Sequence, residues 1–512
     1  MLGLNIYYST FLLLCSFLLL TFSAFSQSFS IEIDKLEAQG ELGFDVVTDA
    51  ESIYVVSNAV CEDSIRWCTP VHSLSQAGEE QWSIILEDFL LSNRDNLSLT
   101  DGNLYVTSHS PNYGIEDPVV QLAIINQLTG DVVDQVESPL PSDLFAMISN
   151  GHFVHNDLIY VYGSSRSAID NNDVFGYIHI MDVAGTIIDS VYIDLEDVNI
   201  IYDVAISEDG KIYLILDTRE YDPWRGYVYI VQFDPSTLEV TTIWKESLST
   251  STPRFTISSY GFIVAGDPSS SEGLYQLLGI SFEGSELWKE SYYDEENIFN
   301  NFITDMHTTL NGDILITSKY SEPPTNQDDV NEKAMIVRLT EWGEELWLKT
   351  YPTYMPDNSG QTFSTFWKVD ETLDSSIVAA GYVSNTSDFF DPLFENNTKV
   401  VKVRPSGCFF EDDCDPTVQN EYITSTEDIR DGDDIKVQVI VSPIPASSHL
   451  TISSDVKFNG VIVRDAAGII VLRRTVNTDV IDLDIATLSS GVYFLTLESA
   501  SEQFYMSKFI VE

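Results

Sequence analysis

The sequence predicts an all-β protein, in which a seven-bladed β-propeller is followed by a small C-terminal β-sandwich of the immunoglobulin-like kind. Three observations support this fold class. Short strands rich in β-branched and aromatic residues recur about every fifty residues, a glycine turn and a further strand follow in most repeats, and no segment has the apolar periodicity of a helix. A chain of 512 residues is long enough for one repetitive domain and a second, smaller one.

The first 26 residues have the features of a cleaved signal peptide. Residues 11–22 form an apolar run that is too short to span a bilayer comfortably, and the small residues Ala24 and Ser26 precede the expected cleavage before Gln27. Residues 1–10 lack Lys and Arg, so an N-terminal membrane anchor stays the alternative. No later segment is apolar for long enough to form a transmembrane helix, and we therefore expect a soluble, exported mature chain.

The repeat has two markers in the sequence. A recurring strand has its second residue at Ile53, Leu104, Ile159, Ile212, Phe262, Ile314 and Ile377, in steps of 51, 55, 53, 50, 52 and 63 residues. In several repeats a glycine precedes a tryptophan by four places, as at Gly343 and Trp347. We expect this tryptophan strand to be the outer strand of a blade, where the ring buries area between neighbouring blades.

Closure of the ring needs an outer strand from elsewhere in the chain. The seventh repeat has three strands, but Gly407 and Cys408 stand where its fourth strand would begin. Residues 28–36 form a strand pattern that precedes the first repeat and has no sheet of its own. We predict that residues 31–36 pair with the strand around residues 400–403 and complete the last blade.

The cysteines indicate disulfide bonds. Cys15 is lost with the leader, and the other four form two close pairs, Cys61 with Cys68 and Cys408 with Cys414. An even number of cysteines in an exported chain favours disulfides, and local pairing is the favoured one of three connectivities. Metal binding is the alternative, although it usually needs closer spacing.

The charge excludes several classes of partner. Eighty acidic and 25 basic residues give a net charge of −55, which argues against binding to nucleic acid or to anionic lipid. An acidic coat that is screened by salt explains the excess. The Asp- and Asn-rich segments 168–176 and 326–332 leave Ca²⁺ binding open, but neither has the EF-hand spacing, and we expect no other cofactor.

Sequence motifs select no catalytic residues. His152 and His155 would face opposite sides of a strand, and carboxylates are too abundant for an acid–base pair to be chosen. The candidate ligand-binding rim is an aromatic segment in the loop after a strand, and it comprises Tyr221, Trp224, Arg225 and Tyr227. Flat rings beside charged groups suit sugars or peptides, and the alternative is that Trp224 folds back over its blade.

The propeller is expected to span residues 27–415, followed by an acidic linker at 416–436 and a second domain at 437–512. In that domain, short alternating strands, about seven in number, predict a small β-sandwich with a hairpin turn at residues 465–468. Its ordered motif residues are Pro443, Pro445, Ala446, Asp465, Gly468, Leu488, Gly491, Val492, Tyr493 and Lys508.

These residues resemble the type A C-terminal sorting domain of the type IX secretion system. Ile444 replaces the usual Asn, and the chain ends in Phe-Ile-Val-Glu where the family has a basic residue. Residues 28–415 are similar to the propeller repeats of secreted Bacteroidota surface proteins. The resemblance implies export by the type IX machinery, then removal of the domain and either attachment to surface lipopolysaccharide or release.

The sequence therefore predicts a secreted or cell-surface protein whose propeller is a non-catalytic binding module for a glycan or a protein. The alternative is an extracellular polysaccharide hydrolase or lyase with carboxylates on one propeller face. A purely structural component of a surface layer is a third reading.

Overall fold

The structure is a computed structural model of the whole chain. The structure describes residues 28–34, 38–61, 67–91, 95–109, 119–139, 144–167, 174–221, 224–247, 252–266, 275–292, 303–321, 332–351, 363–384, 396–409, 421–424, 439–442, 449–465, 470–486, 488–489, 491–499 and 504–511. The predicted signal peptide lies outside these residues. The chain divides into two compact units, one of residues 26–428 and one that contains residues 429–512. Every described element is a strand, and no described helix is long and apolar enough to cross a membrane.

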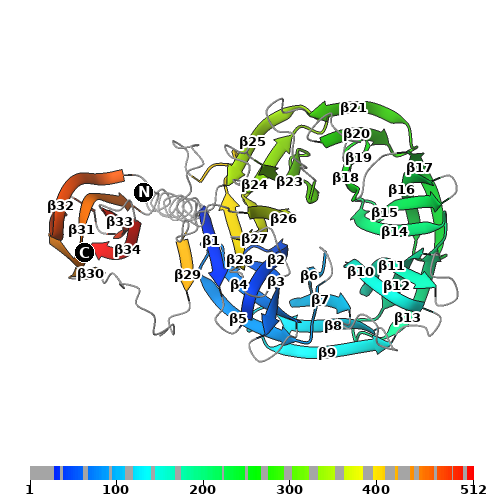
Figure 1. Cartoon of the computed structure of the whole chain (residues 1–512), viewed down its shortest axis with the longest axis horizontal. Coiled ribbons are helices and arrows are strands. Elements are labelled where there is room, and N and C mark those ends of the chain that lie inside the picture. The colour runs from blue at the N-terminus through cyan, green and yellow to red at the C-terminus, as the bar shows by residue number, and fades with distance from the viewer. Residues whose placement is uncertain are drawn as a thin grey trace, which may run out of the picture. The chain divides into compact units, whose positions relative to one another are not determined.

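The described strands β1 (Phe29–Asp34) to β28 (Asn396–Val403) form a seven-bladed propeller, and Figure 1 shows its sheets arranged around one axis. Strands within each blade follow one another antiparallel from the innermost to the outermost. The first three blades are β2 (Ala38–Thr48), β3 (Ser52–Cys61), β4 (Trp67–Ser75) and β5 (Glu80–Glu87); β6 (Leu97–Thr100), β7 (Asn103–His109), β8 (Val119–Asn126) and β9 (Val132–Pro139); β10 (Leu144–His155), β11 (Leu158–Ser167), β12 (Val174–Met181) and β13 (Ile187–Ile193).

The next three blades are built in the same order. They are β14 (Val198–Ile206), β15 (Ile212–Tyr221), β16 (Trp224–Asp234) and β17 (Glu239–Glu246); β18 (Arg254–Ser258), β19 (Gly261–Gly266), β20 (Tyr275–Ser281) and β21 (Glu286–Tyr292); β22 (Asp305–Thr308), β23 (Ile314–Ser321), β24 (Glu332–Leu339) and β25 (Glu345–Tyr351).

The seventh blade contains both ends of the propeller. β26 (Phe363–Glu371), β27 (Ile377–Ser384) and β28 (Asn396–Val403) are followed by β1 (Phe29–Asp34), which pairs antiparallel with β28. Ile31 lies opposite Val400 and Phe29 opposite Lys402, so the predicted closure is confirmed. The segment expected to be a linker contributes a short strand, β29 (Glu421–Thr424), which pairs parallel with the free edge of β1.

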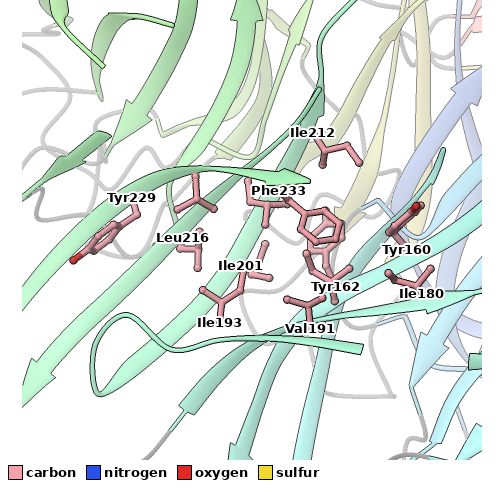
Figure 2. Close-up of a cluster of buried hydrophobic side chains, with 13 residues drawn as sticks. Tyr160, Tyr162, Ile180, Val191, Ile193, Ile201, Ile212, Leu216, Tyr229 and Phe233 are labelled. Carbon is pink, nitrogen blue, oxygen red and sulfur yellow. The ribbon is translucent and has the colours of Figure 1, made fainter. Parts of the chain in front are cut away.

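Apolar side chains fill the space between neighbouring blades. Figure 2 shows one such cluster, in which residues of the third blade, such as Tyr160 and Val191, pack against residues of the fourth blade, such as Ile201 and Phe233. A single four-stranded sheet cannot bury both of its faces, and radial packing of the sheets achieves this.

Outer-strand tryptophans connect two of the blades to the next one by hydrogen bonds. The Trp82 indole donates a hydrogen bond from Nε1 to the Gln127 carbonyl oxygen, 3.0 Å away, in the turn of the second blade. Gly130 of that turn has φ +73°, and a Cβ added there would lie 2.7 Å from the Trp82 ring. Trp347 repeats the arrangement with the Pro405 carbonyl, at 3.1 Å, and Gly407. The predicted packing of tryptophan between blades is confirmed, and each ring contacts the glycine turn of the following blade.

The two ends of the propeller differ in their connections. In an antiparallel sheet, the turn between the first and second strands lies at the same end as the turn between the third and fourth. In the first blade these turns are residues 49–51 and 76–79. We call this end of the propeller the turn face, and the rim predicted at Tyr221 to Tyr227 lies at the opposite end.

The C-terminal unit is a β-sheet domain with its own apolar core. Its strands are β30 (Val439–Ser442), β31 (His449–Asp465), β32 (Ile470–Asp484), β33 (Gly491–Ser499) and β34 (Phe504–Val511). The sequence predicted about seven short strands, whereas the described residues form five. The long strands β31 and β32 pair with each other across register shifts between Ser453 and Gly460, so the alternating pattern breaks within a strand rather than between strands. Leu450, Val461 and Leu495 are among its fully buried core residues.

Candidate functional site

One position recurs on the innermost strand of every blade, and we call these seven residues the central column. Each column residue lies opposite a residue of the second strand of its blade. That residue comes three places after the strand marker, for example Val56 after Ile53. The central column consists of Asp45, Asn96, Gly151, Asp203, Arg254, Asp305 and Lys368. In the first, fourth and seventh blades a β-bulge directly precedes the column residue, which re-aims its side chain.

Three aspartates of the central column connect neighbouring blades. Oδ2 of Asp45 accepts a hydrogen bond of 2.8 Å from the Leu97 amide of the next blade, and Oδ1 accepts one from its own neighbour Val46. Asp203 and Asp305 do the same towards the blade that follows each of them, with acceptor distances of 3.4 Å from the Phe255 amide and 3.0 Å from the Val369 amide. In each of three blades, the aspartate of the central column thus accepts a backbone hydrogen bond from the following blade.

Lys368 is the cation that links the acidic groups. Its ammonium forms ion pairs with Asp95 of the second blade and with Asp305 of the sixth, the latter at 3.4 Å. The other carboxylate oxygen of Asp95 accepts a 2.8 Å hydrogen bond from the Tyr162 hydroxyl. Because these partners come from the second, third, sixth and seventh blades, the cluster lies about the axis of the propeller.

Arg254, the central-column residue of the fifth blade, also links groups from neighbouring blades. The residue is only 2% exposed, and its guanidinium donates to the Thr304 carbonyl at 3.0 Å and to the Tyr202 carbonyl at 2.9 Å. The side chain therefore bridges the fourth and sixth blades, with hydrogen bonds to backbone groups.

Burial shifts the protonation equilibria of the cluster. Desolvation raises the pKa of Asp45 to about 8, with Lys368 acting in the opposite direction, and raises the pKa of Asp203 to about 7. Burial acts in the same direction on Asp95, but the ammonium of Lys368 holds the pKa of that carboxyl below its ordinary value. The pKa of Lys368 is raised well above its ordinary value because the surrounding carboxylates outweigh its desolvation.

These hydrogen bonds and ion pairs connect neighbouring blades of the propeller. A general acid or base needs a carboxyl group within reach of a substrate. Asp45 is fully buried, and Asp203 and Asp305 are 7% and 3% exposed, with oxygens bonded to the backbone of the next blade. The central column was missed at the sequence level, although it has nearly the same spacing as the strand marker.

His152 takes a buried structural position. Both ring nitrogens of His152 lie within hydrogen-bonding distance of hydroxyls, 2.6 Å from Ser98 Oγ and 2.8 Å from Thr107 Oγ1. Burial lowers the pKa of His152 to about 4, so the ring is neutral at physiological pH. Among the described residues no group of acidic, His or Cys side chains could hold a metal ion. Residues 168–173 and 326–331 of the two Asp-rich segments lie outside them.

The predicted ligand-binding rim lies on strands rather than in a loop. Tyr221 ends β15, Trp224 begins β16, and the two residues are opposite each other across a short hairpin. Arg225 pairs with Glu220 in the same ladder. The ammonium of Lys245 lies 3.9 Å from the centroid of the Tyr227 ring, so a cation–π contact occupies one face of this aromatic group.

The predicted disulfide between Cys61 and Cys68 is present, and it joins the end of β3 to the beginning of β4. Cys408 is also disulfide-bonded, while its expected partner Cys414 lies outside the described residues.

The sorting-domain residues fall on the second unit. Asp465 ends β31, and Arg464 pairs with Ile470 across the expected hairpin. Gly491 begins β33, where buried Tyr493 donates a 2.8 Å hydrogen bond to the Ser489 carbonyl, and Lys508 lies opposite Phe494. Pro443, Pro445, Ala446 and Gly468 lie outside the described residues.

Comparison with solved structures shows similarity to several proteins at low sequence identity. The β-propeller domain of the Trilobed protease from Pyrococcus furiosus is 10% identical, with 72% of this chain and 98% of that chain covered and a TM-score of 0.35. The α-L-arabinanase of Penicillium chrysogenum, solved with arabinobiose, is 10% identical over 57% of this chain and 93% of that chain, with a TM-score of 0.37. A Bacteroides caccae protein of unknown function is 12% identical over 60% and 92%, with a TM-score of 0.34.

No curated protein matches this sequence. Residues 441–512 match the family described as the secretion system C-terminal sorting domain. This module directs export through the type IX secretion system to the cell surface or the extracellular space. The chain is therefore a type IX-sorted, secreted protein with a β-propeller fold.

Proposed function

We propose that the secreted propeller is a non-catalytic binding module for a glycan or a protein outside the cell. The observation that carries this proposal is the use of the central aspartates. Asp45, Asp203 and Asp305 each accept a backbone hydrogen bond from the following blade, and Asp95 is paired with Lys368. Carboxylates committed to holding the ring closed are poorly placed to act on a substrate.

A polysaccharide hydrolase or lyase is the second candidate. The pKa values of Asp45 and Asp203, about 8 and about 7, lie in the range that suits a general acid near neutral pH. Their burial and their backbone hydrogen bonds favour the structural role instead. Binding by rigid aromatic and polar groups at the surface of the blades fits the fold better.

The remaining steps of export extend this proposal. We infer that residues 1–26 are removed as a signal peptide and that the domain at 437–512 is removed after passage through the outer membrane. The propeller, residues 27–415, would then be released or joined to surface lipopolysaccharide, with residues 416–436 as the connecting segment.

A glycan and protein array tests the proposed function. The purified full chain should bind at least one class of glycan or surface protein, and this binding should persist at high salt, because salt screens the non-specific attraction of an acidic coat. An array without any bound ligand would contradict the proposal.

A further inference from the structure

We propose that Trp342, on the turn face between the fifth and sixth blades, is a stacking platform for a neutral carbohydrate. This inference rests on the proposed binding function and names its ligand class. Of the tryptophans whose side chains the structure describes, Trp342 alone is exposed, at 53% of its surface. The outer-strand tryptophans Trp82 and Trp347 donate hydrogen bonds to the next blade and are less exposed. Trp342 also contacts a neighbouring blade, but about half of its surface stays exposed.

The Trp342 ring is supported from one side. It stacks on Tyr260 of the fifth blade with ring centroids 4.6 Å apart and an angle of 23° between the planes. The Tyr260 hydroxyl donates to the Glu341 carbonyl at 2.5 Å and accepts from Trp288 Nε1 at 2.6 Å. Tyr260 therefore covers one face of the indole, and the exposed surface of Trp342 remains available to a ligand.

The turn that bears Trp342 is held by three aromatic residues of the fifth blade. Tyr292 donates a hydrogen bond to the Gly343 carbonyl, and Trp288 packs so closely that a Cβ at Gly343 would approach its ring to 3.0 Å. Tyr260 fixes the neighbouring Glu341. A ring that is ordered before binding loses little conformational entropy when the ligand arrives, which favours recognition by a small contact area.

The groups around Trp342 select the chemistry of the ligand. Glu341, Glu344 and Glu345 flank it in the sequence, and Glu341 Oε2 is held by the Ser259 hydroxyl at 2.6 Å. Carboxylates accept hydrogen bonds from sugar hydroxyls while the C–H face of a pyranose ring covers the indole. The same carboxylates and the net charge of −55 repel anionic sugars.

A protein interface fits this surface less well. Glutamate is depleted from the cores of protein interfaces, where a tryptophan hot spot needs a surrounding ring that excludes water. A cationic peptide could pair with the glutamates, but the acidic coat is general and does not single out this turn. The preordered flat ring of Trp342 is what distinguishes this turn, and it matches the face of a sugar.

Binding of the full chain to cellohexaose, xylohexaose and mannohexaose tests the inference. We expect at least one to bind with an affinity that hardly depends on salt, and Trp342→Ala to weaken it by roughly ten-fold or more. Trp342→Phe, which keeps a smaller ring on Tyr260, should retain part of the affinity. Leu373→Ala, at an exposed residue in another tight turn of the turn face, is the matched control and should leave binding unchanged.

The other outcomes separate this inference from the proposed function. Equal binding of a sugar by wild type and Trp342→Ala would show that Trp342 is not the binding site and that the propeller binds the sugar at another surface. A Trp342-dependent affinity for an Arg-rich peptide, lost in its Gln-substituted form and at high salt, would overturn the sugar assignment. If the wild type binds none of the three sugars but binds another ligand on the array, the inference about Trp342 is wrong and the proposed binding function stands. If the wild type binds nothing on the array, the inference and the proposed function are both wrong.

Discussion

At the residue scale, Lys368 determines whether the acidic centre of the propeller is stable. Its ammonium pairs with Asp95 and Asp305, and Asp45 and Asp203 lie within its electrostatic reach. Removal of one partner from a buried ionic cluster leaves uncompensated charge. We expect Lys368→Met to lower the free energy of unfolding by about 3 kcal/mol in urea titrations at neutral pH.

The control for this substitution is an exposed lysine. Lys211 pairs with Asp209 at 2.7 Å, with half of its side chain exposed, so Lys211→Met should leave the urea midpoint unchanged. Equal midpoints for wild type and Lys368→Met would contradict the assigned role of Lys368.

The raised pKa values of Asp45 and Asp203 predict how stability depends on pH. Because both folded-state values lie above the ordinary 3.8, the folded protein holds these protons more tightly than the unfolded chain. Their contribution to the free energy of unfolding is complete below pH 3.8. It is lost as the pH rises through about 7 for Asp203 and about 8 for Asp45. Unfolding free energy should therefore fall between mildly acidic and alkaline pH. Asp203→Asn, which cannot ionise, should show a shallower fall, and an equal slope in the two proteins would refute this.

The residues of the central column can be found in the sequence, but the sequence does not show what their side chains contact. Relative to the strand marker, Asp45 and Arg254 stand eight residues upstream, whereas Lys368 stands nine residues upstream. Whether such side chains bond to the next blade or face a ligand depends on β-bulges before Asp45 and Lys368, which hydrophobic alternation does not reveal. Similarly, Tyr227 looked available in the sequence, yet Lys245 covers one face of its ring.

At the element scale, the seam between β1 and β28 contains a buried acidic and a buried basic side chain that interact electrostatically. Glu32 is 1% exposed and lies opposite Lys399, which is fully buried and donates to the Tyr351 carbonyl at 3.3 Å. Burial raises the pKa of Glu32 to about 7 and lowers the pKa of Lys399 to about 8. The contribution of Glu32 to stability falls as the pH rises from 4.5 to about 7, and that of Lys399 recovers above about 8.

A double-mutant cycle at this seam follows from the pair. Glu32→Gln alone leaves a buried ammonium without its partner, so we expect a loss of about 3 kcal/mol in unfolding free energy. Glu32→Gln combined with Lys399→Met should recover most of this loss, because neither charge then remains to be desolvated. Strict additivity of the two single changes in urea titrations would show that the residues do not interact.

The elements were predictable where hydrophobic alternation is strong. β1 was expected because residues 28–36 alternate without a sheet of their own, and its partner followed from the missing fourth strand of the last repeat. β29 was not expected, since four residues in a polar segment give no alternation to detect. In β31 and β32 the register shifts interrupt the alternation, which made two long strands resemble several short ones.

At the scale of the whole molecule, the sorting domain and the propeller are separate compact units. Removal of residues 441–512 should leave the propeller folded but abolish its appearance at the cell surface and in the medium, with the protein retained inside the cell. Immunoblots of cell fractions measure this, with Lys211→Met as an exported control. Undiminished external protein after truncation would contradict the export route.

If the carboxylates at the axis serve to hold the blades together, as we propose, they do not cleave a substrate. The most direct measurement is product release from those polysaccharides to which the purified chain binds, followed as new reducing ends and unsaturated sugars. We predict retention of the chain on the polysaccharide without product. Turnover that Asp95→Asn or Asp305→Asn abolishes, while the fold persists, would contradict the claim and assign the axis to catalysis.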